Sequence, residues 1–273
     1  MKAFPNLSIF SMLTVALFNT NVLAHGDDPN VTIHTFKNGE TWKNCSFMVD
    51  PSLTQTEFHR FTREAGNIVY FQPLTGASSL GKKHFNLGIA MSNTPIDQTS
   101  GAWNNTFAHP VTETGERPHY LGDKIKLPNL RLAAGITDQI DIGMFVTRDF
   151  SANYGFYGLD LKYSQKIQEN KSVYLAGRIS HARMFGPADL KLNNTAIDLI
   201  ISKKWHILEP YFGISTSWSH ASETTNKVNL KNENIITPRA IVGLKTEYKW
   251  LNAAVEYDFS AVQTLSFRLG AKI

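Results

Sequence analysis

From Phe85 to the end of the chain, apolar and polar positions alternate in about ten consecutive segments. The last segment shows the pattern most clearly. Its apolar side chains stand at every second position: Leu265, Phe267, Leu269, Ala271 and Ile273. Successive side chains of a β-strand point to opposite faces, so each segment predicts a strand with one apolar face. The predicted strands run at about 84–92, 129–136, 140–147, 157–164, 173–180, 196–205, 208–218, 239–250, 251–259 and 264–273.

A sheet with one continuous apolar face needs apolar surroundings, and the sequence offers no other domain to cover it. A soluble β-sandwich also alternates, but the connections distinguish the two folds. Long connections at 94–123, 149–154, 185–194 and 220–234 take turns with short ones at 137–139, 168–171, 206–207 and 250, and only 260–263 breaks the rule. Outer-membrane barrels have long external loops and short periplasmic turns. The sequence therefore predicts an all-β fold, a closed antiparallel up-and-down transmembrane β-barrel of about ten strands. Eight to twelve strands, roughly, stay open, because Ile68–Phe71 could add pairing.

Aromatic side chains fall near the predicted ends of the strands. Tyr163, Trp205, Tyr248 and Trp250 lie at periplasmic ends, and Phe150, Trp218 and Phe259 lie near external ends. Tyr and Trp gather at both membrane interfaces of such barrels, so this placement favours two interfacial girdles.

The N-terminus has the features of a secretory signal peptide. Lys2 supplies a positive charge, positions 9–18 form a short apolar core, and Val22-Leu23-Ala24 is a small-residue cleavage site. We expect a signal peptide at 1–24, a periplasmic or plug segment at 25–81 and a barrel at 82–273. The hydrophobic share of 42% is too low for a helical membrane protein, and alternation explains how a barrel can have it. The net charge of +4 is scattered along the chain, which argues against nucleic-acid binding.

One amphipathic helix is predicted at about 53–65, before the first strand. Thr54 and Glu57 have the spacing of a capping box, Phe58 and Phe61 share one face, and Gly66 is a natural stop. Three places are open to this helix. It could fold into the lumen as a hatch, cap the periplasmic mouth, or remain free for a partner.

Charged residues of the predicted strands fall almost entirely on the polar face, which in a barrel lines the lumen. The predicted lumen-lining charges are Arg131, Asp160, Arg178, Asp198, Arg239, Glu247, Glu256, Asp258 and Arg268. On neighbouring strands their signs alternate, so opposite charges could pair across the sheet. The predicted sets are Asp160 with Arg178 and Asp198, and Glu256 with Arg268. The balance of signs favours a lumen filled by ion pairs over a charged conduction path.

Enzymatic chemistry would need Ser, His and an acid in one constellation. Ser219-His220 and Ser180-His181 are adjacent pairs, and adjacent residues of a strand face opposite ways, so neither pair can form a dyad. His181 and His220 remain catalytic candidates only if a neighbouring strand supplies a partner. The acidic-pair and His–Asp pattern of the omptin proteases does not map onto the chain. We therefore lean against an enzyme.

No metal or cofactor motif is present in the sequence, and none is predicted. His25, Asp27 and Asp28 cluster at the expected mature N-terminus, where a flexible polar terminus is the preferred interpretation. The single Cys45 cannot form an intramolecular disulfide.

The arrangement resembles Gram-negative outer-membrane β-barrel proteins in general. The cleavage site at Val22–Ala24, the strands from Phe85 onward and the alternating C-terminal run carry this resemblance. It implies location in the outer membrane, contact with its lipid and lipopolysaccharide, and recognition of the last strand by the barrel-assembly machinery. The chain ends in Ile273, where that family usually has Phe or Trp. The stretch from Phe58 to Ala90 looks like uncharacterised bacterial barrels with an N-terminal helical segment, which implies no activity.

Three functions are compatible with these patterns. The first is a narrow channel or small-solute translocator with the Phe58–Phe61 helix as its hatch. The second is a barrel hydrolase acting on lipid or peptide. The third is a structural or surface-interaction barrel that uses the connections at 94–123 and 220–234.

Overall fold

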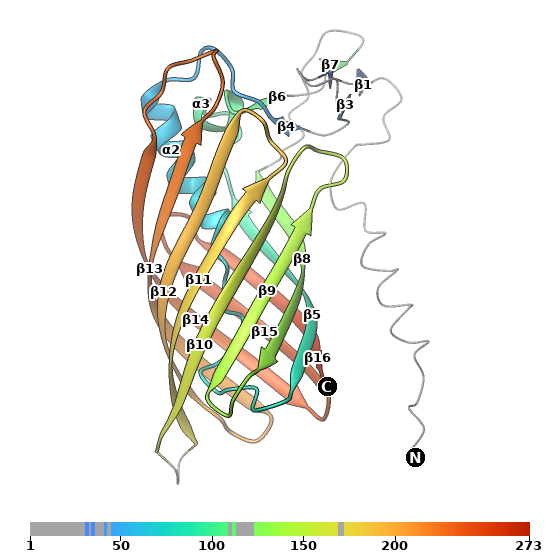
Figure 1. Ribbon diagram of the computed structural model, residues 1–273, viewed down its shortest axis with the longest axis vertical. Coiled ribbons are helices and arrows are strands. Elements are labelled where there is room, and N and C mark those ends of the chain that lie inside the picture. The colour runs from blue at the N-terminus through green and yellow to red at the C-terminus, as the bar shows by residue number, and fades with distance from the viewer. Residues whose placement is uncertain are drawn as a thin grey trace.

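In the computed structural model, ten strands close into one antiparallel barrel (Figure 1). The residues described are 31–32, 34–35, 41–42, 45–108, 111–112, 123–168 and 172–273. The barrel strands are β5 (Phe85–Pro95), β8 (Lys124–Gly135), β9 (Ile140–Arg148), β10 (Gly155–Gln168), β11 (Val173–Phe185), β12 (Leu190–Lys203), β13 (Leu208–Glu223), β14 (Glu233–Tyr248), β15 (Leu251–Phe259) and β16 (Thr264–Lys272). Consecutive strands pair, and β16 pairs with β5 to close the ring. The predicted barrel of about ten strands is confirmed. The predicted signal peptide and the His25 cluster lie outside the described residues.

The remaining elements are short apart from one helix. Helix α2 spans Gln55–Val69 and α3 spans Gly101–Asn104. Strand β4 (Ser46–Phe47) pairs with β6 (Phe107–Ala108). Strand β1 (Val31–Thr32) pairs with β7 (Val111–Thr112), and β2 (His34–Thr35) pairs with β3 (Thr41–Trp42). No described helix is long and apolar enough to cross a bilayer.

Two ends of the barrel are distinguished by their connections. The loop end has the connections after β5, β9, β11, β13 and β15, and the turn end has those after β8, β10, β12 and β14. Two connections at the loop end, 186–189 and 224–232, are shorter than predicted because the strands continue beyond the alternating stretches. Asn194 pairs with Ser219 and Asn193 with His220 there. Backbone pairing needs no apolar face, so alternation underestimates strand length.

The outer surface of the barrel carries an apolar belt. On β12 and β13 the exposed side chains include Ile197, Leu199, Phe212 and Ile214. The aromatic residues predicted at the strand ends are exposed too, with Trp205 at 63% and Phe150 at 83%. The buried charged side chains of the strands, such as Arg178 and Asp198, face the lumen instead. A bilayer requires this, because an outward Lys or Arg at mid-membrane costs roughly 2–4 kcal/mol. The fold and its surface define a transmembrane β-barrel.

Helix α2 lies inside the barrel, in the half nearer the loop end (Figure 1). Its capping box is confirmed, since the Thr54 backbone N–H donates to Glu57 Oε2 at 2.9 Å and Thr54 Oγ1 accepts from the Glu57 N–H at 3.3 Å. The predicted end at Gly66 is wrong by a turn. Gly66 lies within the helix, where a Cβ would stand 2.0 Å from Ser219 Oγ. A glycine here serves close packing against β13 and does not stop the helix.

After α2 the chain descends through the lumen to the start of β5 at the turn end (Figure 1). Residues 70–84 form neither helix nor strand. The suggestion that Ile68–Phe71 adds a strand is therefore wrong, since Ile68 and Val69 belong to α2 and the next two residues pair with no strand. We call residues 55–80 the plug.

Candidate functional site

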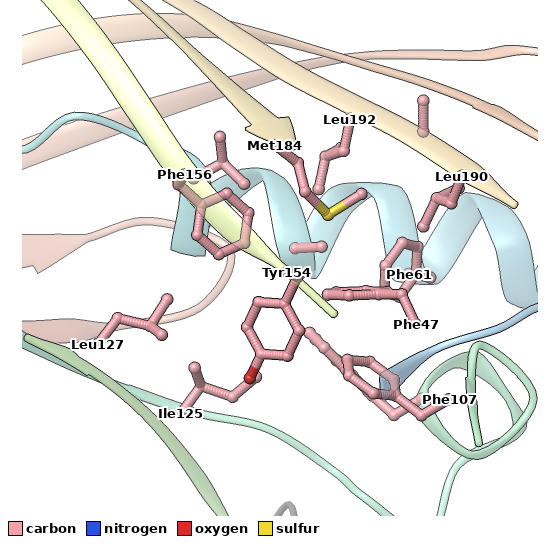
Figure 2. Close-up of a cluster of buried hydrophobic side chains, with 14 of the residues drawn as sticks. Phe47, Phe61, Phe107, Ile125, Leu127, Tyr154, Phe156, Met184, Leu190 and Leu192 are labelled. Carbon is pink, nitrogen blue, oxygen red and sulfur yellow. The ribbon is translucent and has the colours of Figure 1, made fainter. Parts of the chain in front are cut away.

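The loop-end half of the lumen is an apolar cluster around α2 (Figure 2). Phe58 and Phe61 are fully buried. The Phe61 ring lies 5.2 Å from Trp103 of α3 and 5.9 Å from Phe47 of β4, both edge-on. The Trp103 indole N–H donates to Glu64 of the helix at 2.6 Å.

The barrel wall packs against this helix with apolar side chains that point inward. They come from six strand or loop positions: Ile125, Leu127, Tyr154, Phe156, Leu190 and Leu192. At this end of β8 the apolar side chains face the lumen and Lys124 and Lys126 face outward, the reverse of the pattern lower down the strand. The sequence analysis missed this reversal, although the alternation at 124–128 carries it. An internal helix gives an apolar surface something to bury against.

At the waist of the barrel, two aromatic residues of the plug meet the lumenal arginines. The Tyr70 hydroxyl donates to Asp198 at 2.7 Å, and the Arg239 guanidinium lies 3.8 Å from the Tyr70 ring. The Phe71 ring lies 4.8 Å from the Arg131 guanidinium and 4.7 Å from that of Arg178. These distances are within the range of cation–π attraction.

The same arginines hold the backbone of the plug. Arg178 Nη2 donates to the Phe71 carbonyl and Arg131 Nη1 to the Gln72 carbonyl, each at 2.7 Å. Charge-assisted hydrogen bonds of this kind are stronger than neutral ones. The waist is thus closed by contacts from the wall to both side chains and main chain.

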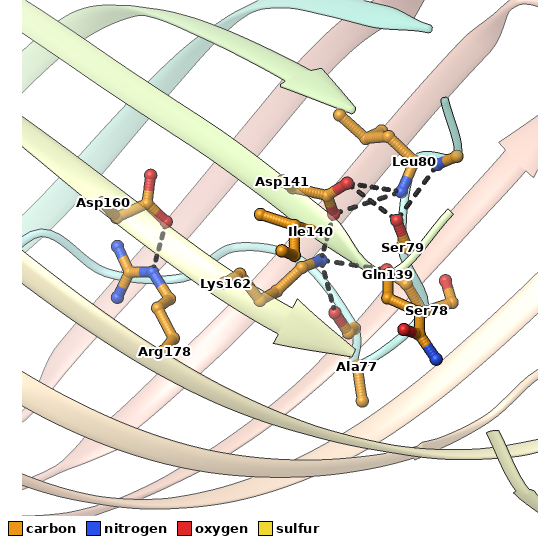
Figure 3. A network of polar contacts seen from close by, with 12 residues as sticks. Ala77, Ser78, Ser79, Leu80, Gln139, Ile140, Asp141, Asp160, Lys162 and Arg178 are labelled. Atoms are coloured by element: carbon orange, nitrogen blue, oxygen red, sulfur yellow. Dashed lines mark hydrogen bonds and ion pairs between the residues drawn. The ribbon is translucent and has the colours of Figure 1, made fainter. Parts of the chain in front are cut away.

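The turn-end half of the lumen is polar, and extended chain fills it (Figure 3). Lys162 Nζ donates to the Ser78 carbonyl at 2.9 Å and pairs with Asp141 at 3.1 Å. Asp141 accepts from Ser79 Oγ at 2.7 Å and from the Leu80 N–H at 3.1 Å. An extended segment satisfies few of its own backbone groups, here by the Gln72 N–H that donates to the Tyr70 carbonyl, so the wall supplies most of their partners.

Two further carboxylates complete this network. Glu209 accepts from the Ser78 N–H at 3.0 Å and from its hydroxyl at 2.7 Å. Glu256 accepts from the Leu74 N–H at 2.9 Å. The absence of a side chain at Gly76 makes space for Glu209, because a Cβ at position 76 would lie 2.2 Å from the Glu209 Oε1 atom.

One of the two predicted ion-pair sets is present. Arg178 pairs with Asp160 at 2.5 Å and with Asp198 at 2.6 Å, linking three strands. Register places Arg178 opposite Asp198 of β12, whereas Asp160 of β10 faces Ser180 and meets Arg178 diagonally.

The predicted pair of Glu256 with Arg268 is wrong. Register sets Glu256 opposite Ser266, and Glu256 accepts from Tyr211 at 2.8 Å. Arg268 donates to the Leu74 carbonyl at 3.3 Å and to Asn86. Both side chains instead form hydrogen bonds with Leu74 of the plug, whose position could not be predicted from the strand pattern.

The other charges predicted to line the lumen form partly unforeseen contacts. Arg239 pairs with Asp258, and Glu247 pairs with Lys245 and Lys272. Lys245 and Glu209, which the sequence analysis did not select, also pair. Their inward positions on β14 and β13 were the available signal.

The two histidine candidates lie on the outer surface with neutral partners. His220 Nδ1 is 2.8 Å from Asn234 Oδ1, and His181 Nδ1 is 2.8 Å from Thr195 Oγ1. Ser219 is buried on the lumen side, so it cannot reach His220 from the same face. Within the described part of the chain, no three His, Cys, Asp or Glu side chains gather as a metal site.

Three small cavities lie between the plug and the wall. Their volumes available to water centres are about 10, 20 and 50 Å³ from the loop end towards the turn end. A single water needs roughly 10–15 Å³ measured this way. Each of these three cavities therefore has room for at most a few waters.

Comparison with known proteins gives likeness of fold at low identity. No protein-family model and no curated protein sequence matches this chain. An outer membrane channel from Pseudomonas putida F1 is similar at 10% identity and a TM-score of 0.46, over 75% of this chain and 100% of that one. Ail, the attachment invasion locus protein of Yersinia pestis, is similar at 8% identity and a TM-score of 0.30, over 70% and 99%. A loop-deletion mutant of OmpT, an outer membrane protein of Vibrio cholerae, matches at 13% identity and a TM-score of 0.32, over 55% of this chain and 54% of that one.

Proposed function

We propose that this protein is a gated conduit for small solutes in a bacterial outer membrane, and that the plug is its gate. The signal peptide expected at 1–24 would export the chain, and outer-membrane lipid and lipopolysaccharide would surround the belt. The observation that carries the proposal is the plug itself. One continuous N-terminal segment occupies the lumen from its loop end to its turn end, without forming part of the wall.

The bonding of the plug is compatible with movement. Apart from the helix interior, its contacts with the wall are side-chain hydrogen bonds, cation–π contacts and apolar packing, which water or a solute can replace one at a time. The plug continues directly into β5 at the turn end. Displacement of the whole plug, residues 55–80, would therefore open the lumen while the chain remains joined to β5.

A reversible tether tests this function. The Ala77 N–H donates to Ser202 Oγ at 3.0 Å, so the pair Ala77→Cys and Ser202→Cys brings two thiols from plug and wall together. The tether is made in a Cys45→Ser background, and solute flux into proteoliposomes is measured before and after reduction. We expect the oxidised protein to be closed and reduction to restore the flux.

A matched control distinguishes the effect of tethering the plug to the wall from the effect of a disulfide within the wall. Ser180 and Ala196 face each other on β11 and β12, both on the lumen side. The pair Ser180→Cys and Ala196→Cys therefore joins wall to wall, and its oxidation should leave flux unchanged. Absence of flux from the unmodified protein, in proteoliposomes and as single-channel steps, would defeat the proposal.

A structural barrel is the second candidate, because the plug is hydrogen-bonded to the wall through both halves of the lumen. In that case flux would be absent whether or not the tether is reduced. The neutral partners of His181 and His220 give no comparable support to a hydrolase.

A further inference from the structure

The three cavities form a row along one side of the plug. The upper one is bounded by β8 and β10 through Ile125, Leu127 and Phe156, and the middle one shares these residues. The middle and lower cavities in turn share Phe71 and Arg131. The contact between Phe71 and Arg131 is thus the partition between them. The wall of the lower cavity is formed mainly by residues of β8, β9 and β10.

The helix is attached to the opposite side of the barrel. The Gly66 carbonyl accepts from Asn194 of β12 at 3.2 Å, and Asn67 accepts from Arg239 of β14 at 2.9 Å. Gly66 also approaches β13 more closely than any other residue type could. Among the described residues, α2 has no hydrogen bond to β8, β9 or β10. On this side α2 is held by apolar contact alone, whereas residues 72–80 below it are hydrogen-bonded to Arg131, Asp141 and Lys162.

The lining changes from apolar to charged along this row, and around the lower cavity three cationic side chains outnumber two carboxylates, Asp141 and Asp160. All residues around the upper cavity are apolar or aromatic. The lower cavity is lined by Arg131 and Arg268, and neither forms an ion pair with a described residue. Lumenal Arg178, Arg239, Lys162 and Lys245 all do.

Three atoms beside the row also lack a hydrogen-bond partner among the described residues, and one of them is a carboxylate oxygen, Asp160 Oδ1 at the lower cavity. Arg268 Nε faces the lower cavity, and the Gln72 side-chain N–H₂ faces the middle one. Arg131 is 6% exposed, and no carboxylate of the described residues lies within ion-pair distance of it. Asp160 also lines the lower cavity, but its charge is shared with Arg178 at 2.5 Å. A buried charge without a partner is costly, and an anionic ligand would supply one.

Resting on the proposed function, we infer that the plug opens along β8–β10 and that this side passes small organic anions that carry an apolar group. The apolar group would follow the upper cavity, and Arg131 with Arg268 would bind the anionic head at the partition.

Flux of matched solutes through the full chain in proteoliposomes tests this inference. Benzenesulfonate has both features, methanesulfonate lacks the apolar group, and benzyltrimethylammonium reverses the charge. We expect benzenesulfonate to pass fastest. The double substitution Arg131→Gln and Arg268→Gln should lower its flux by roughly tenfold and remove the preference over the cation, because charge-assisted bonds are lost.

A second variant blocks the row without touching a charge, in case the double variant does not fold. Leu127→Trp on β8 would fill the space between the upper and middle cavities, and we expect the benzenesulfonate flux to fall several-fold. Leu130→Trp is its control, since Leu130 lies on the same strand, faces the lipid and is 42% exposed. Heat-modifiable gel migration reports whether each variant is folded.

The outcomes separate the two proposals. Flux that stops on tethering Ala77 to Ser202, yet shows no preference for benzenesulfonate in the unmodified protein, keeps the gated conduit and overturns the anion path. Unchanged flux in both Arg131→Gln/Arg268→Gln and Leu127→Trp also overturns it. Absence of all flux removes the conduit itself.

Discussion

The loop-end half of the lumen encloses a helix in apolar surroundings, whereas the turn-end half encloses extended chain among charged side chains. The helix satisfies its own interior backbone groups, so the wall around Phe61 can be apolar. The chain at 70–80 satisfies few of its own backbone groups, so Lys162, Glu209 and Arg131 bind its carbonyls and N–H groups. The backbone conformation of the plug thus decides which chemistry the wall shows at each height.

The largest expected effect is on the apolar half. Phe61→Ala should destabilise the seating of the helix by about 3–5 kcal/mol, because it empties a fully buried aromatic site. Amide hydrogen exchange across 55–69 measures this. Phe212→Ala is the control, since Phe212 faces the lipid and is 46% exposed. Equal acceleration of exchange in both variants would contradict the apolar anchoring of α2.

A smaller effect is expected in the polar half. Glu209→Gln keeps the shape but removes the charge that accepts from Ser78 and pairs with Lys245, so we expect a loss of about 1.5–3 kcal/mol. Exchange of the amides at 76–80 should accelerate while that of the helix stays the same. Faster exchange throughout the helix would show that the halves open as one unit.

The junction of the two halves is tested by Tyr70→Phe. This removes the hydroxyl that donates to Asp198 at 2.7 Å, and we expect a loss of about 1.5 kcal/mol. Exchange at both 66–69 and 71–74 should accelerate, and restriction of the change to one side would place the boundary elsewhere.

The smallest expected effect is at the start of the helix. Thr54→Ala removes the side chain that caps α2, which costs about 1 kcal/mol. The change should appear as fraying of the first turn at Gln55–Phe58, measured by local amide exchange. Undisturbed exchange there would mean that packing alone holds the helix start.

The same cap has a pH dependence. The Thr54 backbone N–H lowers the pKa of the Glu57 carboxyl below its ordinary value of 4.5. A lowered pKa in the folded state stabilises the helix above the unfolded pKa, and this contribution disappears as the pH falls through the folded value. The first turn should therefore fray under acid in the parent protein, after correction for intrinsic exchange. In Glu57→Gln its protection should not change with pH over that range.

Much of the wall could be predicted from the sequence because its pattern is local. Each strand needs only alternation, and the capping box of Thr54 with Glu57 needs only a spacing of three residues. The triad around Arg178 followed because its three charges lie on the lumen face of three neighbouring strands, where opposite charges can pair. The extra turn of α2 beyond Gly66 could not be predicted, because its reason is the close approach of Ser219, a residue far away in the chain.

The sequence by itself determined which side chains face lipid and which face the lumen, since that choice is made residue by residue along each strand. Only the tertiary structure decided that residues 55–80 fill the lumen and that Glu256 and Arg268 bind the plug instead of each other. It also decided that Arg131 has no ion pair with any described residue. Those outcomes depend on closure of the barrel, which brings segments that are distant in the sequence into one narrow lumen. The side chains there must contact one another because the lumen is too narrow to hydrate each of them.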